Sequence, residues 1–204
     1  MERKPHQIII INGPRKSGKD IAAKWIMKEW NDIRHMKFSG PMKHSLRELF
    51  NLPDHLWKRL EHEDSGALKL EPLPELFGKS WVEVLMWYSE EVLKPKFGKG
   101  VFGKLLATAL VAPTMTMATV ISDSGFDEEV HEVLKCFQPK NVHVFQLFRE
   151  GHTFAGDSRK YLDATDFPAG VTWWPINNDY DKGMYRRQIL MRMNKIFGGE
   201  RTYD

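Results

Sequence analysis

The chain has 204 residues, is 42% hydrophobic, and carries 30 Lys and Arg against 27 Asp and Glu, a net charge of +3. This length suits one sizeable core with an inserted subdomain and is short for two independent domains. The small, evenly spread charge argues against a protein that binds nucleic acid duplexes. The single cysteine, Cys136, excludes an internal disulfide framework and is expected to be a buried small hydrophobe in a reducing compartment.

The sequence shows no apolar run of membrane-spanning length and no signal peptide. We therefore expect a cytoplasmic protein, in the host cytoplasm if it is viral, with neither a membrane nor a nucleic acid as partner. The eight histidines show no spacing typical of a metal site, and isolated surface or core histidines are the better interpretation.

The most informative segment lies near the N-terminus. Four consecutive isoleucines at 8–11 predict a strand that is buried on both faces, as in a parallel sheet. A G-x-x-x-x-G-K motif follows at 13–19, and a helical pattern begins at Asp20. A phosphate-binding loop has this order, because backbone N–H groups and the helix N-terminus bind phosphate oxygens while Lys19 reaches the terminal phosphates. A plain glycine turn is the alternative.

The residues expected to bind ATP are mostly those of this loop. They are Gly13, Pro14, Arg15, Lys16, Ser17, Gly18, Lys19, Asp20 and, from the last strand end, Asn177. Asp20 stands where the commonest form of the motif has Ser or Thr, whose hydroxyl binds Mg²⁺. The carboxylate could hold the ion directly or through water, or it could be a favourable acid in the first helical turn. Both interpretations stay open.

The middle of the chain is predicted to be mostly helical. A short strand is expected at 34–39 and, after a Gly-Pro turn, a helix at 42–50. Residues 51–79 carry three prolines and many charges, which is typical of an irregular surface segment with one short helix. A capping-box pattern of Ser80 and Glu83 begins an apolar-rich helix at 80–92. Another helix is expected at 101–111.

The rest of the chain alternates strands and helices. A buried strand at 117–123 ends in an acid, and a helix at 127–137 and a strand at 142–148 follow. The polar stretch at 149–168 predicts a flexible lid. A last strand at 171–176 and a helix at 182–197 complete the pattern. Strands that alternate with helices predict an α/β fold, a parallel sheet with right-handed crossovers.

Phosphoryl transfer needs cations and an acid that orients a metal, so these residue types are the candidates. Asp123 ends a predicted strand, where sheet topology would bring it beside the phosphate loop; a turn aspartate before Gly125 is the alternative. Arg149 and Arg159 flank and enter the lid, where guanidinium groups could close over phosphates, with surface solvation as the alternative. Lys43 begins a helix and opposes its dipole, which suggests an anionic ligand.

The end of the last strand offers a candidate site for the base. Trp173 and Trp174, with the polar Asn177, Asn178 and Asp179 after them, could frame a purine ring. A tryptophan on a short strand is, however, more often part of the core.

Three segments resemble, in order, the signatures of bacteriophage-type deoxynucleoside monophosphate kinases. They are residues 13–20 (GPRKSGKD), 38–43 (FSGPMK) and 120–123 (VISD). Residues 148–151 and 176–179 are similar to the start of that family's lid and to its last nucleotide-side loop. Phosphomevalonate kinases of the animal type share the S-G-K-D loop, the S-G-P-x-K turn and the S-D strand end, so another phosphorylated small molecule is the alternative acceptor.

The resemblance implies a three-layer P-loop kinase fold in a single domain, 1–204. Its core would be 1–39 and 113–204, with a mostly helical acceptor-binding insert at 40–112 and a lid at 149–168. It also implies ATP and Mg²⁺ as cosubstrates, a deoxynucleoside monophosphate as acceptor, and a homodimer. The residues expected to be catalytic are Lys19, Arg149 and Arg159. Acceptor binding is assigned to Lys43, Arg47 and Asp123, and metal binding to Asp20 and Asp123.

Two positions depart from the family pattern. The family continues S-D-x-R after the third strand, whereas this chain has Gly125, and its substrate helix has Trp81 and Leu85 where an arginine and a glutamine are usual. Another cation must then pair with the acceptor phosphate, and Lys43 is the first choice, with Arg47 as its neighbour. The missing arginine also leaves open a nucleotide-binding regulator without turnover.

Overall fold

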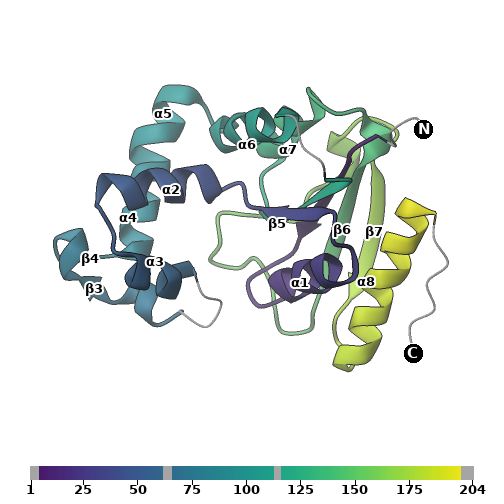
Figure 1. Ribbon diagram of the computed structural model, residues 1–204, viewed down its shortest axis with the longest axis horizontal. Coiled ribbons are helices and arrows are strands. Elements are labelled where there is room, and N and C mark those ends of the chain that lie inside the picture. Colours follow the sequence, from purple (N-terminus) through teal and green to yellow (C-terminus); the bar gives the residue numbers. More distant parts are fainter. Residues whose placement is uncertain (1–4, 62–65, 113–115, 199–204) are drawn as a thin grey trace.

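The computed structural model describes residues 5–61, 66–112 and 116–198. It is an α/β fold on a five-stranded parallel sheet with the strand order β2-β5-β1-β6-β7 (Figure 1). The strands are β1 (Gln7–Asn12), β2 (Ile33–Met36), β5 (Ala118–Ser124), β6 (Val142–Phe148) and β7 (Thr172–Asn177). The predicted α/β class and parallel sheet are confirmed.

The four isoleucines of β1 alternate between two cores, one on each face of the sheet. Ile8 and Ile10 pack on the side of α6 and α7, whereas Ile9 and Ile11 pack on the side of α1 and α8. All four side chains are fully buried, as expected for a strand covered on both faces. Figure 1 shows the two helix pairs on opposite sides of the strands. They are α1 (Lys19–Glu29), α6 (Val101–Val111), α7 (Asp127–Leu134) and α8 (Lys182–Phe197).

The segment between β2 and β5 forms a group of helices beside the sheet, which we call the insert (Figure 1). Its α-helices are α2 (Gly40–Leu49), α3 (Asp54–Glu61), α4 (Trp81–Trp87) and α5 (Lys94–Phe97), and α6 leads back to the sheet. Its short elements are two 3₁₀ turns, η1 (Leu68–Leu70) and η2 (Pro74–Leu76), the two-stranded hairpin β3 (Pro72–Leu73) and β4 (Lys79–Ser80), and the π-helix η3 (Tyr88–Leu93).

The capping box at Ser80 is confirmed, but the helix it begins is not a single α-helix. Ser80 Oγ accepts a hydrogen bond from Glu83 N, and the Glu83 carboxylate accepts one from Ser80 N. The α-helix then ends at Trp87, and the π-helix η3 leads into α5, which contains Pro95. A proline has no N–H to donate and clashes with the preceding turn, so a regular α-helix cannot continue through it.

Other boundaries differ from the prediction by a few residues. β2 ends at Met36 and not at Ser39, because Ser39 is already the N-cap of α2. The helix expected at 127–137 ends at Leu134. Cys136 follows that end and is exposed, so its expected burial was wrong.

Residues 149–171 leave β6 at the carboxyl edge of the sheet, return to the start of the parallel strand β7, and include the 3₁₀ turn η5 (Ala164–Asp166). Asn12 at the end of β1 holds this segment, since it donates to Lys160 O (3.0 Å) and accepts from Leu162 N (3.1 Å). Among the described residues, no helix has both the length and the apolar character needed to cross a membrane.

Candidate phosphate-binding site

The loop of residues 13–18 lies between β1 and α1 at the carboxyl edge of the sheet. Gly18 has φ 102° and could not be another residue without a clash, because a Cβ atom there would lie 2.7 Å from Asn178 Nδ2. Gly13 allows a similarly close approach, with Leu147 O 3.0 Å from the position of its missing Cβ. The two glycines of the motif therefore fit the loop tightly against β6, the segment after β7, and α8.

Three side chains fix three consecutive carbonyl groups of the loop from outside. The hydrogen bonds run from Arg149 Nη1 to Lys16 O (2.8 Å), from Asn178 Nδ2 to Ser17 O (2.8 Å) and from Tyr185 OH to Gly18 O (3.0 Å). Several loop amides find no acceptor within the described part of the chain, namely the N–H groups of Arg15, Lys16, Gly18 and Lys19. Anchored carbonyls beside free N–H groups at a helix N-terminus are the arrangement that binds phosphate oxygens.

Lys19 is the cation of the loop, and its side chain folds back over it. Its Nζ donates to Gly13 O (2.7 Å) and Pro14 O (2.6 Å), and only 8% of the residue is exposed. Burial, together with the positive charge of Arg159, lowers the pKa of Lys19 to about 8. An anion that entered the loop would raise this pKa again, so the lysine is arranged for an anionic ligand.

Asp20 takes part in a polar chain that links α1 to two strands. Its Oδ1 pairs with Lys37 Nζ (3.0 Å) and accepts from Ser122 Oγ (2.8 Å), which in turn lies 2.7 Å from His35 Nε2. Burial alone would raise the pKa of Asp20, but the charge and the hydrogen bond of Lys37 and the hydroxyl of Ser122 outweigh it and lower the pKa. Asp20 therefore stays ionised at the mouth of the loop.

The second oxygen of Asp20 is available for a metal ion. Its Oδ2 has no bonding partner in the part of the chain that the structure describes. Within that same part, no three His, Cys, Asp or Glu side chains gather into a metal-binding group. Mg²⁺ needs only one or two carboxylates when phosphate oxygens and water complete its shell, so the residues present fit this ion.

Asp123 lies near the end of β5, and both of its oxygens are engaged. Oδ1 accepts from Phe38 N (2.7 Å), and Oδ2 accepts from Ser39 N (3.0 Å) and Ser39 Oγ (2.7 Å). The carboxylate thus fixes the turn between β2 and α2, across from its own strand, and not a local turn before Gly125. These hydrogen bonds fix the position at which the chain leaves β2 and enters the insert.

The two arginines expected in the lid occupy different places. Arg149 is exposed just after β6 and donates to the outer side of the loop, at Lys16 O. Arg159 is largely covered, and Asp157 holds its guanidinium with two parallel bonds, from Nε to Oδ1 (3.0 Å) and from Nη2 to Oδ2 (2.6 Å). Arg149 thus supports the loop, while Arg159 lies close enough for its charge to affect Lys19.

The cations expected to bind the acceptor are paired with acids inside the insert. Lys43 Nζ lies 2.8 Å from Glu61 Oε1. Arg47 pairs with Asp54, and its guanidinium lies over the ring of Trp57, 5.4 Å from the centroid. Lys43 and Arg47 are therefore neighbours along α2, as expected, but each has its own partner.

The loop contact expected of Asn177 comes from the next residue. Asn177 Oδ1 accepts from Asp179 N (2.7 Å) and so closes a local turn, whereas Asn178 donates to the phosphate loop. Lys37 was not among the predicted site residues, although it follows the end of β2, where parallel strands bring polar residues together. No sequence pattern marked Tyr185 or Asp157 as a site residue. The partner of Tyr185 is far away in the sequence, and the pairing of Asp157 with Arg159 depends on how the connection between β6 and β7 folds.

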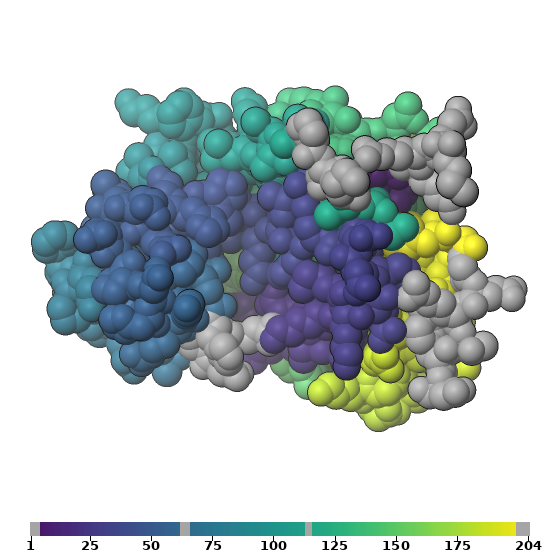
Figure 2. Space-filling model, viewed as in Figure 1, coloured from purple at the N-terminus to yellow at the C-terminus, as the bar shows by residue number. Residues whose placement is uncertain are grey.

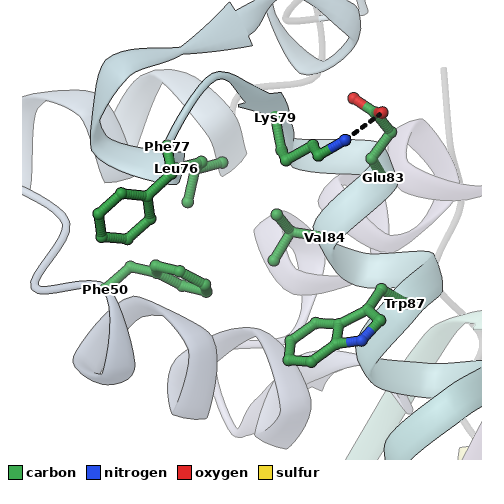
Figure 3. Close-up of a pocket in the computed structure, with 7 residues that line it drawn as sticks. All are labelled: Phe50, Leu76, Phe77, Lys79, Glu83, Val84 and Trp87. Carbon is green, nitrogen blue, oxygen red and sulfur yellow. Dashed lines mark ion pairs between the residues drawn. The ribbon is translucent and has the colours of Figure 1, made fainter.

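Two cavities lie beside these elements. One, of about 520 Å³, lies next to the start of α1 (Figure 2 shows this face, with the insert on the left and α1 to its right). Its wall includes Asp20, Lys37, Gly40, Pro41, His44 and Glu61. The other, of about 460 Å³, lies inside the insert and is lined by Phe50, Leu76, Phe77, Val84, Trp87 and the Lys79–Glu83 pair (Figure 3). Of the two, only the first is lined by Asp20, at the start of α1.

No protein-family model matches this chain, and no curated protein matches it either. Among solved structures, the chain is similar to a protein of Chloroflexus aurantiacus described as a "putative kinase". The identity is 12%, the TM-score is 0.45, and the alignment covers 98% of this chain and 100% of the other. A likeness of this size supports no conclusion about activity.

Proposed function

We propose that this chain is an ATP-dependent phosphotransferase that transfers the γ-phosphoryl group to a deoxynucleoside monophosphate. The observation that carries the proposal is the phosphate loop, with its carbonyls bonded from outside, its amides free and Lys19 buried beside them. The acceptor class rests on the sequence resemblance, since the cavities alone do not identify a base.

The chain's own groups would supply position and charge, which is most of what phosphoryl transfer requires. The loop amides bind the phosphate oxygens of ATP, and Lys19 moves from two carbonyl groups to the terminal phosphate. Asp20 holds Mg²⁺ through its free Oδ2, and this ion supplies charge neutralisation at the transferring oxygens. A phosphate monoester acceptor is already anionic, so no strong base is needed.

The acceptor would lie in the cavity between α1 and the start of the insert. Glu61, on its wall, pairs with Lys43 and lies near two further lysines, Lys37 and Lys69. Burial and the positive charges of Lys43 and Lys37 lower the pKa of Lys69, whereas Glu61 opposes this effect. An anionic ligand would add to the acids that already face Lys37, Lys43 and Lys69, and the acceptor phosphate is such a ligand.

Ligand-induced stabilisation tests the proposal. A nonhydrolysable ATP analogue should raise the melting temperature, and one deoxynucleoside monophosphate should raise it further, because ligands that bind only the folded state stabilise it by mass action. The same monophosphate should then be phosphorylated by ATP and Mg²⁺.

Failure to bind the analogue would overturn the assignment of the loop. Binding without transfer to any deoxynucleoside monophosphate would overturn the acceptor, and phosphomevalonate would be the next one tried; no turnover with either would indicate a regulator.

A further inference from the structure

The side chain of Arg159 crosses directly over the α-carbon of Gly125. A Cβ atom built at Gly125 would lie 2.4 Å from Arg159 Cβ, 2.6 Å from Cγ and 2.9 Å from Cδ. Contacts this short with a side-chain stem leave no room for any other residue at this position. The chain therefore has a glycine one residue after β5 because an arginine occupies the space that a side chain would take.

The backbone around Arg159 is fixed to the same edge of the sheet as the phosphate loop. Lys160 N donates to Gly125 O (3.1 Å), and Asn12 Nδ2 bonds both Ser124 O (3.1 Å) and Lys160 O (3.0 Å). Asn12 is fully buried and directly precedes Gly13, the first residue of the loop. Arg159 is thus tied to the loop through one side chain.

Asp157 determines which edge of the guanidinium remains open. The Asp157 carboxylate accepts hydrogen bonds from Arg159 Nε and Nη2. The remaining nitrogen, Nη1, has no bonding partner within residues 5–61, 66–112 and 116–198. The Asp157 carboxylate also outweighs burial and raises the pKa of Arg159. The result is a permanently charged, oriented donor with one free face.

The positive charge of Arg159 also acts on Lys19. After burial, the charge of Arg159 is the largest cause of the lowered pKa of Lys19. The two positive charges disfavour each other, and a phosphate bound by both would relieve the repulsion.

We propose that Gly125 and Asp157 are positioning residues that fix the Arg159 guanidinium, so that it binds the phosphate chain of the nucleotide together with Lys19. The inference rests on the proposed function only in that the loop binds such a chain. It deepens that proposal, because it assigns Arg159 to the sheet edge and not to a segment that must close.

The test measures binding of inorganic tripolyphosphate and of ATP by calorimetry, so it needs no acceptor and no turnover. Arg159→Ala should weaken both affinities about tenfold or more, as expected for loss of a charge-assisted hydrogen bond. Gly125→Ala should weaken them by a similar factor although Arg159 is still present. The double variant should be no worse than Arg159→Ala alone, because both changes remove the same contact.

Two controls distinguish loss of the Arg159 position from general loss of structure: chemical rescue of Arg159→Ala, and an alanine substitution at another glycine. Added methylguanidinium should restore part of the affinity of Arg159→Ala, since the space over Gly125 is then empty, and should restore less in the double variant. Gly66→Ala is the control, because a Cβ there meets no atom within 4 Å. If Gly125→Ala does not fold, Asp157→Asn provides the same test, with an expected loss of affinity at unchanged circular dichroism. Wild-type affinity in folded Gly125→Ala or Asp157→Asn would overturn the inference, whereas the absence of kinase activity in the wild type would not.

Discussion

In the phosphate loop, carbonyl groups are bonded from outside and amide groups are left free; in the insert, the cations expected to bind a ligand are already bonded to acids. Arg149 and Asn178 hold the loop from behind, so nothing has to move before phosphate oxygens meet the N–H groups. Lys43, in contrast, must leave Glu61 before it can bind an acceptor.

The difference indicates how affinity would be divided between the two substrates. Backbone donors that are already in place lose little entropy when their ligand arrives, so the nucleotide side should bind tightly even though Lys19 must exchange two carbonyl groups for phosphate. A site that exchanges an internal ion pair for a ligand gains only the difference between the two interactions. The acceptor should therefore bind more weakly, and its affinity should depend on Glu61, the acid that pairs with Lys43.

The largest effect is expected at the prearranged side. Lys19→Ala should lower turnover by at least a hundredfold, because losing a cation at the transferred group costs on the order of 3 kcal/mol in transition-state stabilisation. The measurement is steady-state turnover with saturating ATP and acceptor. Lys28→Ala, an exposed lysine on the same helix, is the control and should keep full activity. Near-wild-type turnover by folded Lys19→Ala would show that the loop is not the active centre.

The buried state of Lys19 should also appear in the pH dependence of stability. Because burial lowers its pKa from 10.5 to about 8, the unfolded chain binds more protons than the folded one between these values. The free energy of unfolding should therefore rise with pH across this window, relative to Lys19→Met, by on the order of 3 kcal/mol. Urea denaturation of both proteins at pH 7.5 and at about pH 10.5 measures the difference. Parallel curves would mean that Lys19 is well solvated.

Local patterns in the sequence were enough to predict the fold and the loop. Four isoleucines, a glycine motif and a helical period are adjacent in the chain, and the structure has them in that arrangement. The capping box at Ser80 is local in the same sense and is also present. What could not be predicted was the split of the helix after Trp87, because a π-helix has no distinctive sequence period.

The site was predicted only where its residues are close in the sequence. Asn178 and Tyr185 meet the loop across more than 160 residues, so only the folded chain reveals them. Arg159 was expected to act from a lid, and its packing over Gly125 could not be inferred from either residue alone. Lys43 was singled out for its unfavourable place at a helix start, a pattern that does not reveal the compensating Glu61.

Smaller effects are expected at the two acids at the border of loop and insert. Asp20→Asn should raise the Mg²⁺ concentration for half-maximal rate, because the free Oδ2 loses its charge. Asp123→Asn should instead lower stability by about 1–3 kcal/mol, since an amide cannot accept all three bonds from residues 38 and 39. Mg²⁺ titrations of activity and thermal denaturation of both variants separate the roles. A shifted Mg²⁺ dependence in Asp123→Asn would make that residue a metal ligand as well.

The smallest effects are expected in the insert, where Lys43 and Glu61 compete with the acceptor for each other. Lys43→Ala should raise the acceptor KM several-fold and leave the KM for ATP unchanged, because only the acceptor side is touched. Glu61→Gln should act in the opposite direction and lower the acceptor KM, since Lys43 no longer has an ion pair to break. The pair is partly exposed, with side-chain exposures of 15% and 31%, so its own contribution to stability should stay at or below about 1 kcal/mol. Equal losses of stability in the two variants, with neither KM changed, would make the pair purely structural and would require another cation to bind the acceptor phosphate.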